Sequence, residues 1–200
     1  MAMGKKEVVF TVDLEDWYHA LEDEYYKTEL SAAFKEIVPY LILLLEDHGI
    51  KAIFYVLGWI AYKDESQIRL ISDEGHIIGS HGTLHKKGEK IGDFSDRRCR
   101  DLLDYIVNKE TLYYRSPYWD TTPMPWPPAG GFFFRFMPYW YVKWAVKKSG
   151  VFWIHPHDLY ENHPKLKNPW LNWKRHVGLK NARRKLERLL SDQDIRWATL

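Results

Sequence analysis

Short apolar runs alternate with helix-like segments along the whole chain, and this alternation constrains the fold more than any other feature of the sequence. Strands that alternate with helices favour an α/β fold with a mostly parallel sheet, because each helix carries the chain back to the same end of the sheet. Long loops are expected over 116–131 and between 155 and 179. The expected strands are 8–12, 52–57, 76–80, 112–114, 151–154 and 195–200, and the expected helices are 31–48, 66–74, 96–108, 139–148 and 179–190.

Four polar residues each follow directly after one of these expected strands. They are Asp13, His81, Arg115 and His155. In parallel α/β sheets and barrels the carboxyl ends of the strands meet at one edge, and active sites are built at that edge. The four strands therefore direct polar side chains to a single predicted pocket.

The composition limits the possible classes of function. The formal charge is only +2, which argues against a nucleic-acid-binding protein. Cys99 is the single cysteine, which excludes an internal disulfide framework and a cysteine-based zinc site. No stretch has the length of a membrane span and the N-terminus has no apolar signal-peptide core, so we expect a cytoplasmic protein. Without a repeat or a linker, residues 1–200 are expected to form one domain, and the sequence does not indicate an oligomeric state.

His81 and His85 form an H-x-x-x-H pair directly after an expected strand. On a helical turn, residues four apart share a face, so two imidazoles at this spacing can bind one divalent ion. The chain has nine histidines, and a pair at this spacing can also arise by chance. Its position at a strand end nevertheless indicates a metal site.

Three carboxylates, Asp13, Glu15 and Asp16, lie within four residues at the end of the first expected strand. Crowded carboxylates repel one another unless a cation or a shared proton relieves them. The alternative is a solvated loop in which Asp16 caps the following turn. In an extended chain Asp13 and Glu15 point to one side, while Leu14 points to the other side and packs into the wall of the sheet.

Two further segments combine chemistry with an expected strand end. Arg115 precedes a proline and the aromatic residues Tyr118 and Trp119, and a guanidinium suits a carboxylate because it donates paired hydrogen bonds. His155 is followed two residues later by His157, which adds a second imidazole. The alternatives are an ordinary surface arginine and a partly buried loop histidine.

Taken in order, these segments resemble the polysaccharide deacetylase family, the NodB-homology esterases. The family's motifs appear here as T-V-D-L-E-D-W at 11–17, H-G-T-L-H at 81–85, R-S-P-Y-W at 115–119 and I-H-P at 154–156. The resemblance implies a distorted, incomplete (β/α) barrel of about six to seven strands. It also implies an enzyme that binds one divalent metal ion, usually zinc, and removes N-acetyl groups from sugar residues of a polysaccharide or glycolipid.

The first motif departs from the common form of the family, because Leu14 stands where that form has a metal-binding aspartate. It is closer to a variant subgroup with a D-x-E-D-W motif, which is associated with bacterial capsule, exopolysaccharide and lipopolysaccharide gene clusters. The segment 130–140, G-G-F-F-F-R-F-M-P-Y-W, also resembles that subgroup. The usual fourth motif of the family is not recognisable here.

The resemblance implies a role for each motif residue. Of the two candidates for the carboxylate ligand, Glu15 is favoured over Asp16 because it points to the same side as Asp13. An aromatic wall for stacking on sugar suits a chain with ten Trp and thirteen Tyr. The expected catalytic residues are Asp13 as general base, Arg115 as its orienting partner and His155 as general acid; the expected metal ligands are His81, His85 and Glu15 or Asp16; the expected sugar-binding residues are Tyr118, Trp119 and Trp126.

Two alternatives to a sugar deacetylase stay open. One is another metal-dependent amide hydrolysis on the same scaffold, such as an allantoinase-like ring opening. The other is a catalytically silent, carbohydrate-binding member of the family. A serine hydrolase with a nucleophile elbow is excluded because the sequence has no G-x-S-x-G, and a nucleotide-binding protein is excluded because it has neither G-x-x-x-x-G-K-[ST] nor G-x-G-x-x-G.

Overall fold

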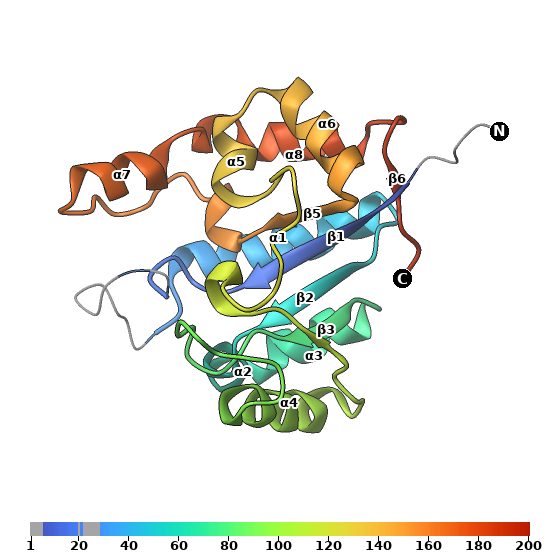
Figure 1. Ribbon diagram of the computed structural model, residues 1–200, viewed down its shortest axis with the longest axis vertical. Coiled ribbons are helices and arrows are strands. Elements are labelled where there is room, and N and C mark those ends of the chain that lie inside the picture. The colour runs from blue at the N-terminus through green and yellow to red at the C-terminus, as the bar shows by residue number, and fades with distance from the viewer. Residues whose placement is uncertain (1–5, 20, 22–28) are drawn as a thin grey trace.

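A computed structural model describes residues 6–19, 21 and 29–200 of the chain. In this part of the chain six parallel strands form one sheet, in the order β4–β3–β2–β1–β5, and β6 pairs with the start of β1. The sheet curls into a half-barrel surrounded by helices (Figure 1), which confirms the predicted incomplete barrel. The strands are β1 (Glu7–Leu14), β2 (Ala52–Val56), β3 (Ile77–Ser80), β4 (Tyr113–Tyr114), β5 (Val151–Ile154) and β6 (Arg196–Trp197).

The helices lie around this sheet, with α2, α3 and α4 on the side of β3, and α5, α6 and α8 on the side of β5 (Figure 1). None of the helices that the structure describes is long and apolar enough to cross a bilayer. The helices are α1 (Ala32–Asp47), α2 (Gly58–Lys63), α3 (Glu65–Asp73), α4 (Phe94–Val107), α5 (Gly131–Phe136), α6 (Tyr139–Ser149), α7 (Pro169–His176) and α8 (Ala182–Leu190), and the short 3₁₀ turns are η2 (Pro117–Trp119), η3 (Pro156–Leu159) and η4 (Leu179–Asn181).

Strand β1 is the centre of the sheet, because it pairs with β2 on one edge and with β5 on the other. Its side chains alternate between two environments, as the period of a strand requires. Thr11 and Asp13 face the site described below. Leu14 is buried in the core as the sequence predicts, together with Val8, Phe10 and Val12.

The predicted elements are present, with ends that differ by a few residues. The strand predicted for 195–200 is reduced to β6, and the helix predicted for 179–190 is divided into η4 and α8. Helices α2, α5 and α7 were not predicted, because helices of eight residues or fewer have too few turns to show a period. The segment Asn168-Pro169 was assigned to a loop, but Asn168 is the N-cap of α7 and accepts hydrogen bonds from the backbone of Trp170 and Leu171.

Candidate active site

A pocket of about 270 Å³ opens at the carboxyl ends of the strands. Asp13 lies next to the last residue of β1, His81 follows β3 and His155 follows β5, and all three line the pocket. Arg115, which follows β4, lies behind Asp13 and contacts it. The structure therefore brings together the four polar residues that follow the predicted strands.

Glu15, His81 and His85 form a buried cluster at one end of the pocket. Oε2 of Glu15 lies 2.5 Å from Nε2 of His85 and 4.0 Å from Nε2 of His81. Nδ1 of His81 lies 2.8 Å from the carbonyl oxygen of Arg115. Because a carbonyl only accepts hydrogen bonds, Nδ1 carries the proton and the lone pair on Nε2 faces the cluster.

The segment between the two histidines is a loop, so the helical turn expected for the H-x-x-x-H pair is wrong. Gly82 and His85 both have left-handed backbone angles, with φ of 75° and 58°, and this folds the chain back more tightly than a helix does. The two rings still converge, with centroids 5.3 Å apart. A Cβ at position 82 would lie 1.7 Å from the Glu89 carboxylate, so the close packing of that buried side chain also requires glycine.

Asp13 and Arg115 form a buried ion pair through Nη1 of Arg115 and Oδ1 of Asp13. The same Nη1 donates to Oγ1 of Thr11 at 3.0 Å. The guanidinium lies between the rings of Tyr55 and Trp119, and its Cζ is 4.1 Å from the centre of each ring. These contacts fix Arg115, which in turn holds Oδ1 of Asp13 and leaves Oδ2 toward the pocket, 3.8 Å from Nε2 of His155.

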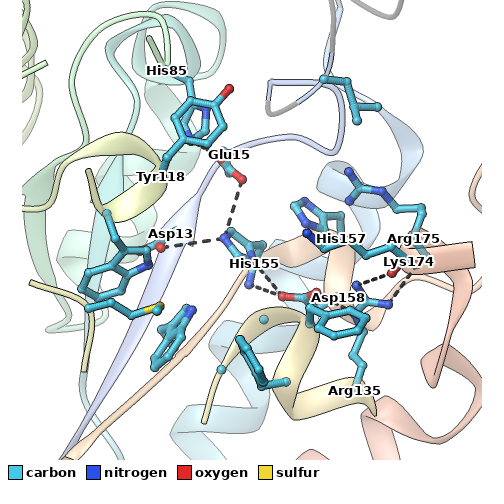
Figure 2. Close-up of a pocket in the computed structure, with 18 of the residues that line it drawn as sticks. Asp13, Glu15, His85, Tyr118, Arg135, His155, His157, Asp158, Lys174 and Arg175 are labelled. Atoms are coloured by element: carbon cyan, nitrogen blue, oxygen red, sulfur yellow. Dashed lines mark hydrogen bonds and ion pairs between the residues drawn. The ribbon is translucent and has the colours of Figure 1, made fainter. Parts of the chain in front are cut away.

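His155 is held by a second chain of polar contacts (Figure 2). Its Nδ1 donates to Oδ2 of Asp158 at 2.8 Å, and its backbone N–H donates to the same oxygen at 2.9 Å. Oδ1 of Asp158 accepts from Nε of Arg135 at 2.8 Å. This arrangement fixes the imidazole so that Nε2 points toward Asp13 and Glu15, 3.6 Å from Oε1 of the latter.

The environment sets the charge of each group. Burial alone would raise the pKa of Glu15, but the His85 and His155 imidazoles outweigh burial and hold this pKa well below its usual value. Burial lowers the pKa of His81 to about 4, so that imidazole is neutral at pH 7. Burial opposes the charge on His155 as well, but Asp158, Glu15 and Asp13 raise its pKa to about 9. The pocket thus combines an anionic Glu15, a neutral His81 and a protonated His155.

The Glu15, His81 and His85 cluster fits a divalent metal ion. One ligand atom from each residue lies within 4.8 Å of the others. The buried Oε2 of Glu15 has no satisfied hydrogen bond among the described residues and faces the imidazoles of His85 and His81. Two imidazole nitrogens and one carboxylate oxygen are a donor set typical of zinc with an open position.

Asp16, the other candidate for the carboxylate ligand, does not face this cluster. Its Oδ1 accepts from the Trp17 N–H at 2.7 Å and from Oγ of Ser31 at 2.5 Å, and its Oδ2 accepts from the Ser31 N–H at 2.6 Å. Ser31 is the N-cap of α1. The structure therefore corrects the assignment of Asp16 as a possible ligand, because its carboxylate ties the chain after β1 to the start of α1.

The predicted aromatic wall is present in part. Tyr118 and Trp119 line the pocket, and the ring of Tyr118 lies 4.5 Å from that of His85. Trp126 is 79% exposed and is not among the residues that line this pocket, so its part in sugar binding stays a prediction. The predicted loop 116–131 carries it past the rim, whereas Phe132 at the start of α5 supplies an aromatic ring to the pocket instead.

Sequence reasoning gave no role to Asp158, Arg135 or Arg175, which all line the pocket. Asp158 had a local signal, because an acid three residues after His155, with a proline between them, fits a capping box on η3. His157 was noted, and it stacks on His155 with ring centroids 4.7 Å apart and an interplanar angle of 5°. It also forms a second possible ligand group with Glu15 and His155.

Comparisons with solved structures agree with the fold. The Bc1960 peptidoglycan N-acetylglucosamine deacetylase aligns with a TM-score of 0.62 and 18% identity, over 98% of this chain and 87% of that protein. BA3943 of Bacillus anthracis, described as a pseudoenzyme of carbohydrate esterase family 4, aligns with a TM-score of 0.54 and 14% identity, over 76% of this chain and 56% of that one. The same fold is therefore shared with an enzyme and with a pseudoenzyme.

Curated relatives are similar over part of their length. A peptidoglycan-N-acetylglucosamine deacetylase of Bacillus cereus is 27% identical over 114 residues, which are 52% of this chain and 42% of the relative. The peptidoglycan-N-acetylmuramic acid deacetylase PdaA of Bacillus subtilis is 30% identical over 84 residues, 40% of this chain and 32% of the relative. The matched region thus spans less than half the length of either relative.

Two family models divide the chain. Residues 117–200 match a domain of unknown function, DUF3473, which includes β5 and His155. Residues 2–123 match the polysaccharide deacetylase model, which includes β1 to β4 and the Glu15, His81 and His85 cluster. Because that second match covers more than half of the chain and contains the motifs at 11–17, 81–85 and 115–119, the protein belongs to the polysaccharide deacetylase family.

Proposed function

We propose that this protein is a metal-dependent deacetylase that removes acetyl groups from N-acetylated sugars of a polysaccharide or glycolipid. The observation that carries the proposal is the meeting of three units in one pocket. They are the Glu15, His81 and His85 cluster, the Asp13–Arg115 pair and the His155–Asp158 pair. Hydrolysis of an amide needs a Lewis acid or oxyanion donor, a base and an acid, and these units supply all three functions.

Glu15, His81 and His85 would hold the ion. A bound divalent ion supplies Lewis acidity, which polarises the acetyl carbonyl and lowers the pKa of water. The donor set favours Zn²⁺. Burial of all three side chains keeps bulk water away from this end of the pocket, which strengthens electrostatic contacts there.

Asp13 would act as the general base through Oδ2. Arg115 occupies Oδ1, so the second oxygen is the one that faces the pocket and can accept a proton from an attacking water. Because Thr11, Tyr55 and Trp119 hold the guanidinium, the carboxylate has one orientation rather than several. Arg115 is therefore a positioning residue for the base.

His155 would act as the general acid through Nε2. Asp158 accepts the Nδ1 proton, so the proton on Nε2 is the one that points into the pocket. Since the pKa of His155 is raised to about 9, this proton is present at neutral pH. It can pass to the nitrogen of the sugar amine as the C–N bond of the amide breaks.

The test is acetate release from N-acetylglucosamine oligomers by the zinc-loaded protein, with Asp13→Asn as the inactive control. We expect release by wild type and none by the variant at equal metal content. Ring opening of a cyclic amide, without acetate release from sugars, would support the other amide hydrolysis. Zinc binding and oligosaccharide binding with no release from any amide would indicate a silent, carbohydrate-binding member and refute the proposal.

A further inference from the structure

Arg175 on α7 is a buried cation that lines the pocket, with only 9% of its surface exposed. Its Nη2 donates to the carbonyl oxygen of Trp17 at 2.8 Å. No carboxylate of the described residues lies within ion-pair distance of its guanidinium. A buried charge without an opposite charge is strongly unfavourable, so such a group in a pocket indicates a site for an anion.

The acids of the pocket are already paired with other cations. Asp13 pairs with Arg115, and Asp158 pairs with both Arg135 and His155. Glu15 contacts His85 and belongs to the candidate metal cluster. Each pocket acid of the described residues is therefore already in contact with another group, and Asp158, Glu15 and Asp16 act on Arg175 only from beyond ion-pair distance. Burial lowers the pKa of Arg175 to about 10, which still leaves the guanidinium charged at neutral pH.

Lys174, the preceding residue of α7, adds a second positive charge at the rim of the same pocket. Its side chain is exposed, and Nζ lies 5.7 Å from the centre of the Phe132 ring. In Figure 2 Lys174 and Arg175 lie beyond His157, and Glu15 and His85 lie on the other side of His157. The pocket that holds the candidate metal ligands therefore also holds a buried guanidinium with no ion pair of its own among the described residues.

We infer that Arg175 binds an oxyanion on the substrate, so that the protein acts on acidic N-acetylated sugars that carry a carboxylate or phosphate group. This inference rests on the proposed function and names its substrate class. A guanidinium donates paired hydrogen bonds that match the geometry of such oxyanions. With the acid group at Arg175, the rest of the sugar would lie in the same pocket as the Glu15, His81 and His85 cluster.

The alternative is that Arg175 only ties α7 to the chain after β1 through the Trp17 carbonyl. Binding measurements separate the two roles. The zinc-loaded protein is titrated by calorimetry with N-acetylglucosamine, N-acetylmuramic acid and N-acetylglucosamine 6-phosphate. The two acidic sugars distinguish a carboxylate from a phosphate. Wild type is compared with Arg175→Met, Arg175→Lys and the control Lys180→Met, which removes an exposed charge from η4 outside the pocket.

We expect wild type to bind at least one acidic sugar about tenfold or more tightly than the neutral sugar, the effect of one charge-assisted hydrogen bond. Arg175→Met should abolish that preference and change the affinity for the neutral sugar by less than about twofold. Arg175→Lys should keep part of the preference, and Lys180→Met should keep all of it. If Arg175→Met does not fold, the salt dependence of the two affinities in wild type replaces it, because only the acid-specific part should weaken with salt.

Equal affinity of wild type for all three sugars would overturn the inference. So would a preference for the acidic sugar that survives in Arg175→Met, because the carboxylate would then be held by the metal ion. An equal loss for every sugar would show a purely structural role. If the protein selects acidic sugars through Arg175 but releases no acetate, the proposed hydrolysis is refuted, and only the binding of an oxyanion by Arg175 stands.

Discussion

Glu15 and Asp16 are adjacent acids that the structure assigns to different tasks, and a pair of isosteric substitutions should separate these tasks. Glu15→Gln removes the charge from the only carboxylate in the cluster with His81 and His85. Loss of a direct ligand should lower zinc affinity by more than about 100-fold, beyond the range of about 10–100-fold typical of outer contacts. Stability without metal should also fall, because the His85 and His155 imidazoles that hold the pKa of Glu15 low favour the ionised side chain in the folded protein.

Asp16→Asn should weaken zinc binding far less than Glu15→Gln does and should act mainly on stability. The Asp16 carboxylate accepts three hydrogen bonds, and an amide nitrogen in place of one oxygen leaves one N–H or O–H of Trp17 or Ser31 without an acceptor. An orphaned buried donor costs about 1–3 kcal/mol. At about 2–4 °C per kcal/mol for a chain of this size, the melting temperature should fall by about 2–12 °C. Burial raises the pKa of Asp16, so the charge that the substitution removes is itself disfavoured in the folded protein. We therefore expect a fall in melting temperature in the lower half of this range.

The assay is zinc titration by calorimetry together with thermal unfolding of the metal-free proteins, with wild type measured in parallel. The reasoning requires that Glu15→Gln loses zinc affinity, and that Asp16→Asn loses stability while it keeps most of its zinc affinity. If Asp16→Asn weakens zinc binding more than Glu15→Gln does, the ligand assignment is wrong. If both variants lose both properties equally, the two acids act as one unit and the division of tasks is refuted.

Three other changes have expected outcomes. Asp158→Asn should lower kcat for acetate release by about 10²–10⁴-fold with unchanged zinc content, because His155 loses the acceptor that fixes its Nδ1 proton; steady-state kinetics and elemental analysis check this. Gly82→Ala should weaken zinc binding more than Gly88→Ala. A Cβ at position 82 would lie 1.7 Å from the Glu89 carboxylate, whereas a Cβ at position 88 would have nothing within 4 Å. Because φ is positive at both positions, the comparison controls for backbone strain. As the pH is lowered from 6.5 to 4, the free energy of unfolding in urea should fall, and it should fall less in His76→Gln. Burial and Lys51 lower the pKa of His76 in the folded protein to about 4. The unfolded chain therefore binds the proton at a higher pH than the folded chain, and protonation favours unfolding.

Each of these predictions has a contradicting outcome. A kcat for Asp158→Asn within about threefold of wild type would make Asp158 a structural residue only. Equal zinc affinity of the two alanine variants would show that the Glu89 contact does not shape the loop. Identical pH dependence of wild type and His76→Gln would show that other groups carry the loss of stability.

The strand ends were predictable from the sequence because apolar runs and the polar residues after them are local signals. These signals placed Asp13, His81 and His155 at strand ends, and the parallel sheet brings those strand ends together at one edge. The sequence could not show that the segment after β3 is a loop rather than a helical turn, because the left-handed angle of His85 depends on the packing of its loop. Arg175 had no local signal at all, because its burial arises only when α7 folds against the chain after β1.

The pairing of β5 with β1 has a practical consequence for the two matched segments of the chain. The boundary between them, near residue 120, crosses the sheet and the pocket rather than a linker between modules. A fragment ending at residue 123 would keep the cluster around Glu15 but would leave one edge of β1 without a partner strand. Such an unpaired edge is expected to promote aggregation. The fragment would also lack His155 and Arg175. The segment that matches the domain of unknown function thus supplies part of the same sheet and the same pocket. We therefore expect that neither matched segment can be expressed alone with a complete site.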